Sequence, residues 1–271
     1  MKLDLSKVQF SKYDFNHNIR VPSKLTKELA YFSGVHFGDG NLGNYRKHYY
    51  SVEYSGHLID EYEFYTIYFA NLFKDLFNKD LRLYEIKRIQ GDYLTLCTQS
   101  KAIFTFLSKS VGLPIGHKNN QPLPEVVLQS KFSKDFLRGL ADADFCMTFK
   151  KRNKNLHYYP VISLKSSSNL MVSQINDLLK NFNFKTYTLF DYPGKRYNKI
   201  HVGHYVEING VDQLEFWMKK IGFKSRKHIT KYLVWQKFGF CPPYTNLPQR
   251  ELILKGELDH YSFYKNAPKS L

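Results

Sequence analysis

Two short apolar stretches, rich in small residues and each with an aspartate close to its end, constrain the fold of this chain more than any other feature. They span residues 32–40 (FSGVHFGDG) and 137–145 (LRGLADADF), and their aspartates, Asp39 and Asp144, lie 105 positions apart. Repetition at this distance predicts a duplicated domain rather than a solenoid, whose repeats are about 20–50 residues long.

The segments around the two stretches follow one order, helix–strand–strand–helix–strand–strand–helix. Hydrophobic periodicity and turn signals predict, in the first half, a strand at 47–56, a helix at 60–73, strands at 81–89 and 93–98 and a helix at 101–110. In the second half they predict strands at 145–150 and 158–165, a helix at 168–179, strands at 185–190 and 199–208 joined by a turn at Pro193-Gly194, and a helix at 211–220. The sequence therefore predicts an α+β fold of two αββαββα half-domains.

This order also suggests where the chain divides. Two prolines make residues 121–131 a plausible linker, and neither end of the chain has a repeat counterpart. We expect an N-terminal extension at residues 1–23, a first half-domain at 24–120 and a linker at 121–131. A second half-domain at 132–235 and a C-terminal extension at 236–271 follow.

Small residues one helical turn apart allow two helix backbones to approach closely. Gly34 and Gly38 have this spacing in the first stretch, as do Gly139 and Ala143 in the second. If the two helices pack together, their aspartates emerge side by side at the helix ends where the dipole is negative. Such a pair favours a divalent cation such as Mg²⁺, although an Asp-Gly pair is also a common helix-end signal.

The chain is strongly basic, with a formal net charge of +16. Residues 1–130 have 16 Lys and Arg against 13 Asp and Glu, whereas residues 131–271 have 24 against 11. Together with 21 Tyr and 22 Phe, this charge favours a nucleic-acid partner, the alternative being a basic surface that serves solubility alone. Three scattered cysteines argue against a disulfide framework or a zinc site. The absence of a signal segment or of a long apolar run predicts a soluble, intracellular protein.

The two stretches resemble the motif of the LAGLIDADG homing endonucleases, and the resemblance extends over residues 25–235. The second copy matches closely. The first has His36 at an apolar motif position and Phe37 where the motif has its first acid, and Phe145 replaces the closing glycine of the second. The resemblance implies a single-chain, pseudo-twofold enzyme with two antiparallel DNA-binding sheets and the motif helices packed at a central seam. Such enzymes cut both DNA strands and leave short 3′ overhangs.

The resemblance also implies roles for individual residues. Asp39 and Asp144 are the expected metal ligands, with the backbone carbonyls of Gly38 and Ala143 as further ligands. Mg²⁺ is the expected cofactor, Mn²⁺ a substitute and Ca²⁺ a non-cleaving occupant. Lys118 and Lys227 are expected to act in catalysis, with Lys224 and Arg226 as alternatives. Asp142 is expected to be a capping or interface group, and His36 a packed seam residue.

Basic and aromatic residues on the sheet faces and turns are the expected DNA contacts: Arg46, Lys47, Tyr49, Arg82, Arg88, Lys150, Arg152, Lys165, Lys195, Arg196 and Lys199. The implied partner is double-stranded DNA with a long, weakly palindromic or non-palindromic site. The resemblance further implies an intron-encoded monomer, in the cytoplasm, the nucleoid or an organelle matrix, that needs no membrane or protein partner. The alternative is an RNA-splicing maturase or a non-cleaving nucleic-acid-binding protein on the same fold.

Overall fold

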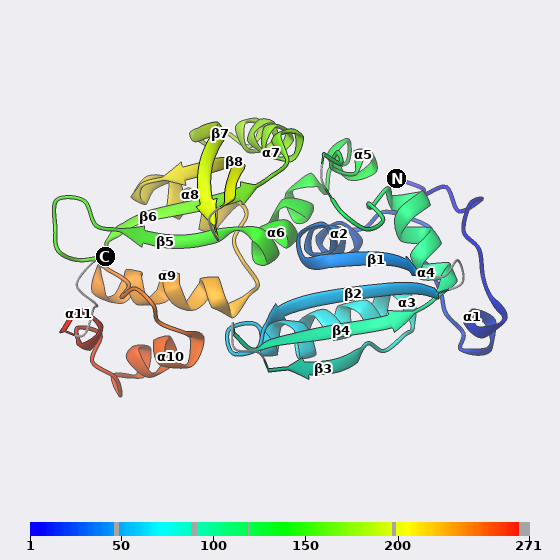
Figure 1. Ribbon diagram of the computed structural model, residues 1–271, viewed down its shortest axis with the longest axis horizontal. Coiled ribbons are helices and arrows are strands. Elements are labelled where there is room, and N and C mark those ends of the chain that lie inside the picture. Colours follow the sequence, from blue (N-terminus) through cyan, green and yellow to red (C-terminus); the bar gives the residue numbers. More distant parts are fainter. Residues whose placement is uncertain (46–48, 88–90, 119, 197–198, 266–271) are drawn as a thin grey trace.

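Two halves of the chain repeat one arrangement in the computed structural model, which describes residues 1–45, 49–87, 91–118, 120–196 and 199–265 (Figure 1). The first half contains α2 (Lys27–Asp39), β1 (Gly40–Tyr45), β2 (Tyr49–His57), the π-helix η1 (Phe64–Phe69) continued by α3 (Ala70–Phe77), β3 (Arg82–Ile86), β4 (Tyr93–Gln99), and α4 (Lys101–Thr105) continued by the π-helix η2 (Phe106–Val111). The second contains α6 (Ser133–Asp144), β5 (Cys146–Lys150), β6 (Tyr159–Ser166), α7 (Asn169–Asn181), β7 (Thr186–Arg196), β8 (Lys199–Asn209) and α8 (Val211–Lys220).

Each half has one antiparallel four-stranded sheet, and the two sheets share the same strand order, β1-β2-β4-β3 and β5-β6-β8-β7. One face of each sheet is buried. In the first, Tyr54 pairs with Leu96, and both side chains are buried, whereas the adjacent pair, Glu53 and Cys97, points to the opposite face. The predicted duplicated α+β fold is therefore confirmed.

The two motif helices, α2 and α6, pack directly against each other at the centre of the molecule (Figure 1). A Cβ atom added to Gly34 would lie 2.1 Å from the carbonyl oxygen of Phe136, and one added to Gly139 would lie 2.0 Å from that of Tyr31. The backbones are thus in contact at both positions, where only glycine fits. The small residues of the two stretches form one seam, as the resemblance implies.

Two details of the strands differ from the prediction. The turn expected at Pro193-Gly194 is wrong, because β7 continues through both residues to Arg196. β7 is an edge strand, where a proline without an N–H is tolerated, and the irregularity falls earlier, between Leu189 and Tyr192. The first half also begins its sheet directly after the motif helix, with β1, which was missed because GNLGNY is poor in strand-forming residues.

Further helices lie outside the repeated order. They are α1 (Lys12–Asn16), α5 (Glu125–Leu128), α9 (Arg226–Phe238), α10 (Leu247–Lys255) and α11 (Ser262–Lys265). α9 lies along β5, where Trp235 stacks on Phe149, and α10 packs on α9 (Figure 1). Within the described ranges, no helix is both long enough and apolar enough to cross a membrane.

Candidate catalytic site and nucleic-acid interface

Asp39 and Asp144 are the last residues of the two seam helices and leave the seam at the same end. A Cβ atom on Gly38 would lie 2.5 Å from Cβ of Ala143 and 3.3 Å from Cγ of Asp144. The four residues named as metal ligands are therefore neighbours. The seam brings the two aspartates together because each directly follows the second small residue of its helix, Gly38 in α2 and Ala143 in α6.

The surroundings of the two carboxyls disfavour their charged forms. Burial, followed by the charges of Asp144 and Glu61, raises the pKa of Asp39 to about 7, against a hydrogen bond from the Tyr65 hydroxyl (2.6 Å). Burial also raises the pKa of Asp144, although Lys118 and Lys227 oppose the rise. Asp144 has the more exposed surface, so solvent screens its charge more than that of Asp39.

The two predicted catalytic lysines flank the aspartates in different ways. Lys118 Nζ donates to the carbonyl oxygen of Gly38, and burial lowers the pKa of this lysine against the attraction of Asp144 and Asp39. Lys227 Nζ lies 2.5 Å from a carboxylate oxygen of Glu61. Burial alone would lower the pKa of Lys227, but its interactions with Glu61 and Asp39 outweigh burial and raise it. The structure thus brings all four predicted catalytic residues into one centre.

Glu61 is a third carboxylate at this centre, and the sequence reasoning missed it. One of its carboxylate oxygens accepts a hydrogen bond from the Lys227 ammonium, and the other accepts one from the backbone N–H of His57 at 2.7 Å. Glutamate is common near the start of a helix, where it favours the dipole, so its position in the sequence gives no reason to single it out. Tyr65 was missed as well, because it belongs to a helical pattern of apolar residues that predicts a buried core position.

Asp142 has a different task from the two terminal aspartates. Its buried carboxylate accepts the Tyr31 hydroxyl (2.6 Å) across the seam and the backbone N–H groups of Lys224 and Ser225 (both 3.0 Å) just before α9. Burial raises the pKa of Asp142 to about 6 against these hydrogen bonds. The prediction was a capping or interface group, and the interface role is confirmed.

The side chains of the alternative basic residues, Lys224 and Arg226, have partners other than Asp39 and Asp144. The Lys224 ammonium lies over the rings of Tyr31 and Tyr68, 5.4 and 4.8 Å from their centroids, and Arg226 pairs with Glu63 at 2.8 Å and with Glu251. His36 is buried, with Nδ1 2.9 Å from the Tyr54 hydroxyl. Burial and the charge of Lys118 hold the pKa of His36 well below its usual range, so this residue is a neutral packing group.

The donor set at the seam fits a hard divalent cation. Two carboxylates with raised pKa values would be relieved by a positive ion between them, and oxygen ligands suit Mg²⁺. The Gly38 carbonyl accepts from Lys118 but has a second lone pair. Among the described residues, no group of three or more His, Cys, Asp or Glu side chains is arranged to hold a metal ion.

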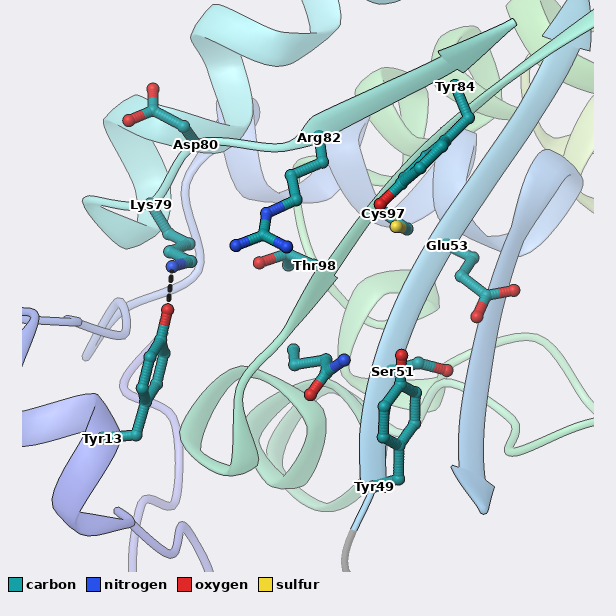
Figure 2. A pocket seen from close by; sticks show the side chains of 11 residues that line it. Tyr13, Tyr49, Ser51, Glu53, Lys79, Asp80, Arg82, Tyr84, Cys97 and Thr98 are labelled. Carbon is teal, nitrogen blue, oxygen red and sulfur yellow. Dashed lines mark hydrogen bonds between the residues drawn. The ribbon is translucent and has the colours of Figure 1, made fainter.

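A hollow of about 240 Å³ lies on the solvent-facing side of the first sheet. Arg82 on β3, Cys97 on β4 and Glu53 on β2 stand opposite one another across three strands and line it, together with Tyr49 and Tyr84 (Figure 2). At one end Lys79 donates to the Tyr13 hydroxyl at 2.7 Å (Figure 2). Two predicted DNA contacts, Tyr49 and Arg82, therefore share a hollow with both donors and acceptors.

The corresponding face of the second sheet contains further predicted contacts. Lys150 lies 3.2 Å from Glu207, the Arg152 guanidinium lies 3.6 Å from the ring centroid of Tyr159, and Lys165 Nζ lies 5.5 Å from that of Tyr192. The backbones of Lys195, Arg196 and Lys199 pair at the far end of β7 and β8. Their side chains, like the whole of Arg46, Lys47 and Arg88, lie outside the described residues, so these contacts stay predictions.

Two antiparallel sheets joined at a seam of paired helices, with an aspartate at the end of each helix, are the arrangement that the resemblance to the LAGLIDADG proteins implies. Residues 131–222, which contain the second of the two motifs, match the family model of the LAGLIDADG-like domain. The predicted resemblance to this family is thereby confirmed for the second half of the chain.

This chain is similar to solved structures of homing endonucleases, at low sequence identity. I-WcaI bound to its DNA recognition sequence is 17% identical, with 78% of this chain and 87% of that chain covered and a TM-score of 0.50. I-GzeII in complex with its DNA target is 10% identical, with 89% of this chain and 95% of that chain covered and a TM-score of 0.49. I-DmoI with DNA and Mn is 14% identical, with 72% of this chain and 96% of that chain covered and a TM-score of 0.47. Comparison with curated protein sequences finds no match.

Proposed function

We propose that this protein is a site-specific endonuclease that hydrolyses both strands of double-stranded DNA. The observation that carries the proposal is the pair of aspartates, Asp39 and Asp144, at one end of the seam with a lysine beside each. A protein that only binds nucleic acid has no need for two carboxylates whose surroundings oppose their charge. The excess of basic residues and the fold shared with DNA-bound homing endonucleases support a DNA substrate.

Asp39 and Asp144, with the carbonyls of Gly38 and Ala143, would hold divalent metal, with Mg²⁺ as the favoured ion. When bound, the metal supplies activation of water and stabilisation of the departing oxygen. The structures of I-DmoI with DNA and Mn and with DNA and Ca support the use of divalent metal on this fold. Tyr65 orients Asp39 through its hydroxyl, which keeps one carboxylate oxygen in a fixed direction.

Lys118 and Lys227 would each stabilise the negative charge that develops on a phosphate being cut. Lys118 comes from the end of the first half and Lys227 from the end of the second. Each half would thus supply the lysine that acts on one strand of the duplex. Cleavage of both strands across the narrow minor groove would leave short 3′ overhangs.

The solvent-facing sides of the two sheets are the proposed DNA-reading surfaces. Arginine and lysine reach guanine edges or phosphates, whereas Glu53 offers only acceptors and suits a cytosine amino group. Because the residues on the two faces differ, the target would be long and weakly palindromic or non-palindromic.

Incubation with a library of candidate insertion-site duplexes and Mg²⁺, followed by sequencing of the cut ends, tests the proposal. In Mg²⁺ we expect cutting of one set of closely related duplex sequences, with 3′ overhangs at the cut ends. When Ca²⁺ replaces Mg²⁺, we expect binding to these duplexes without cutting. Tight, sequence-specific binding by folded protein without nicking of any duplex would leave a binding protein or a maturase as the function.

A further inference from the structure

A buried cation, Arg250, links the C-terminal segment 241–255 to the catalytic centre. This residue lies on α10, has no counterpart in the first half, and its side chain has no exposed surface. Burial lowers the pKa of Arg250 against the attraction of Asp60, but a guanidinium stays charged in proteins. A fully buried cation is costly unless its donors are satisfied, so its partners indicate what it holds in place.

Arg250 donates to groups from three parts of the chain. Nε lies 2.9 Å from the Thr230 hydroxyl of α9, and another nitrogen donates to the carbonyl oxygen of Thr245. The remaining nitrogen lies 3.4 Å from a carboxylate oxygen of Asp60 in the first half and 3.3 Å from the carbonyl oxygen of Lys227. That Asp60 oxygen also accepts the backbone N–H of Leu247, at the start of α10, at 2.5 Å.

Two of these partners belong directly to the centre. Lys227 is itself a proposed catalytic lysine, and Asp60 precedes Glu61, the carboxylate that pairs with the Lys227 ammonium. Arg250 therefore joins the backbone carbonyl of Lys227 to the side-chain carboxylate of Asp60, the residue before Glu61. On the other side of the seam, Lys118 is held by the Gly38 carbonyl, and the hydrogen bonds of Arg250 do not extend to it.

We propose that Arg250 is a positioning residue that fixes Lys227 and Glu61 for one of the two strand cleavages, so that the C-terminal segment controls one half of the centre and not the other. This inference rests on the proposed nuclease function. Its consequence is strand bias: loss of Arg250 slows one strand and leaves a nicked duplex as the accumulating product.

The test is single-turnover cleavage of the selected target, with each strand labelled separately, at a protein concentration well above the dissociation constant for DNA. In Arg250→Met we expect one strand to be cut about tenfold more slowly or worse, as for other residues that orient catalytic groups. The other strand should stay within about twofold of the unmodified rate, with unchanged DNA affinity. Equal slowing of both strands, or of neither, would overturn the inference, because a general loss of stability affects both.

Lys237→Met is the matched control. Lys237 Nζ donates to the Leu254 carbonyl at 2.7 Å, which also joins α9 to α10 but lies away from Lys227 and Glu61. The Lys237→Met variant should therefore cut both strands at the unmodified rates. If Arg250→Met does not fold, Asp60→Asn weakens the same link from its other end and should give the same bias, whereas an unbiased Asp60→Asn would overturn the inference.

A second readout does not depend on cleavage. In protein with ¹⁵N-labelled lysine, the ammonium of Lys227 paired with Glu61 should give a slowly exchanging signal that disappears in Arg250→Met and persists in Lys237→Met. A signal that persists in both variants would overturn the positioning role. Failure of the unmodified protein to cut any duplex would instead contradict the proposed function, and this signal still tests the role of Arg250.

Discussion

Replacing Asp39 by asparagine should stabilise the metal-free protein at neutral and alkaline pH, although it removes a proposed metal ligand. The pKa of Asp39 is raised from 3.8 to about 7, so the folded state favours the protonated carboxyl. The stability that this preference contributes is complete below pH 3.8 and is lost as the pH rises through about 7. Asparagine does not ionise, so the variant escapes this loss, and its side-chain oxygen can still accept from Tyr65.

The size of the effect follows from the pKa shift. A rise of about three pH units corresponds to about 4 kcal/mol. Because Asp39 is partly exposed, water screens part of its charge, and we expect a gain of about 1–2 kcal/mol above pH 7 that vanishes below pH 4.

Urea unfolding in the presence of a chelator, at several pH values between 4 and 9, measures this difference. Asp177→Asn, at an exposed position on α7, is the control and should show no such gain. Added Mg²⁺ should stabilise the unmodified protein and not Asp39→Asn, because the ion binds the folded state through this carboxylate. A variant that is less stable than the unmodified protein at pH 8, or a gain that does not depend on pH, would refute the reasoning.

Three further changes test the seam, the hydrogen bonds of Asp142 and the DNA-binding surface. Gly139→Ala should destabilise the protein by about 3 kcal/mol or more, since its Cβ would lie 2.0 Å from a backbone oxygen, whereas exposed Glu28→Ala should change the urea midpoint little. Asp142→Ala should cost about 3–5 kcal/mol in the same assay because two backbone N–H groups and a tyrosine hydroxyl lose their acceptor; a loss under 1 kcal/mol would contradict this. Neutralising Lys195, Arg196 and Lys199 together should weaken DNA binding and reduce the slope of log K against log salt by about 0.9 per lost phosphate contact; an unchanged slope would exclude this hairpin from the interface.

The repeat explains why the fold and the two aspartates could be predicted. Glycine inside a helix needs a packing reason, and two matched glycine patterns supply that reason in each other. Once the helices are paired, the positions of Asp39 and Asp144 follow from sequence spacing alone. The predicted lysines followed from the family resemblance.

Glu61 and Arg250 could not be found in this way, because their roles depend on contacts between distant segments. Glu61 meets Lys227, 166 residues later, and Arg250 meets Asp60, 190 residues earlier. Neither residue has a repeat counterpart or a motif around it. The turn wrongly expected at Pro193-Gly194 has a related cause, since the tolerance of an edge strand for proline is visible only once the strand order is known.

Single-turnover cleavage of the selected duplex in Mg²⁺ by Asp39→Asn and Asp144→Asn tests whether the two aspartates act as one centre. We expect each single variant to lose double-strand cleavage while its affinity for the duplex, measured in Ca²⁺, stays within a few-fold of the unmodified protein. Cleavage of both strands at the unmodified rate by either variant would mean that the two aspartates do not form one centre and that the metal site lies elsewhere.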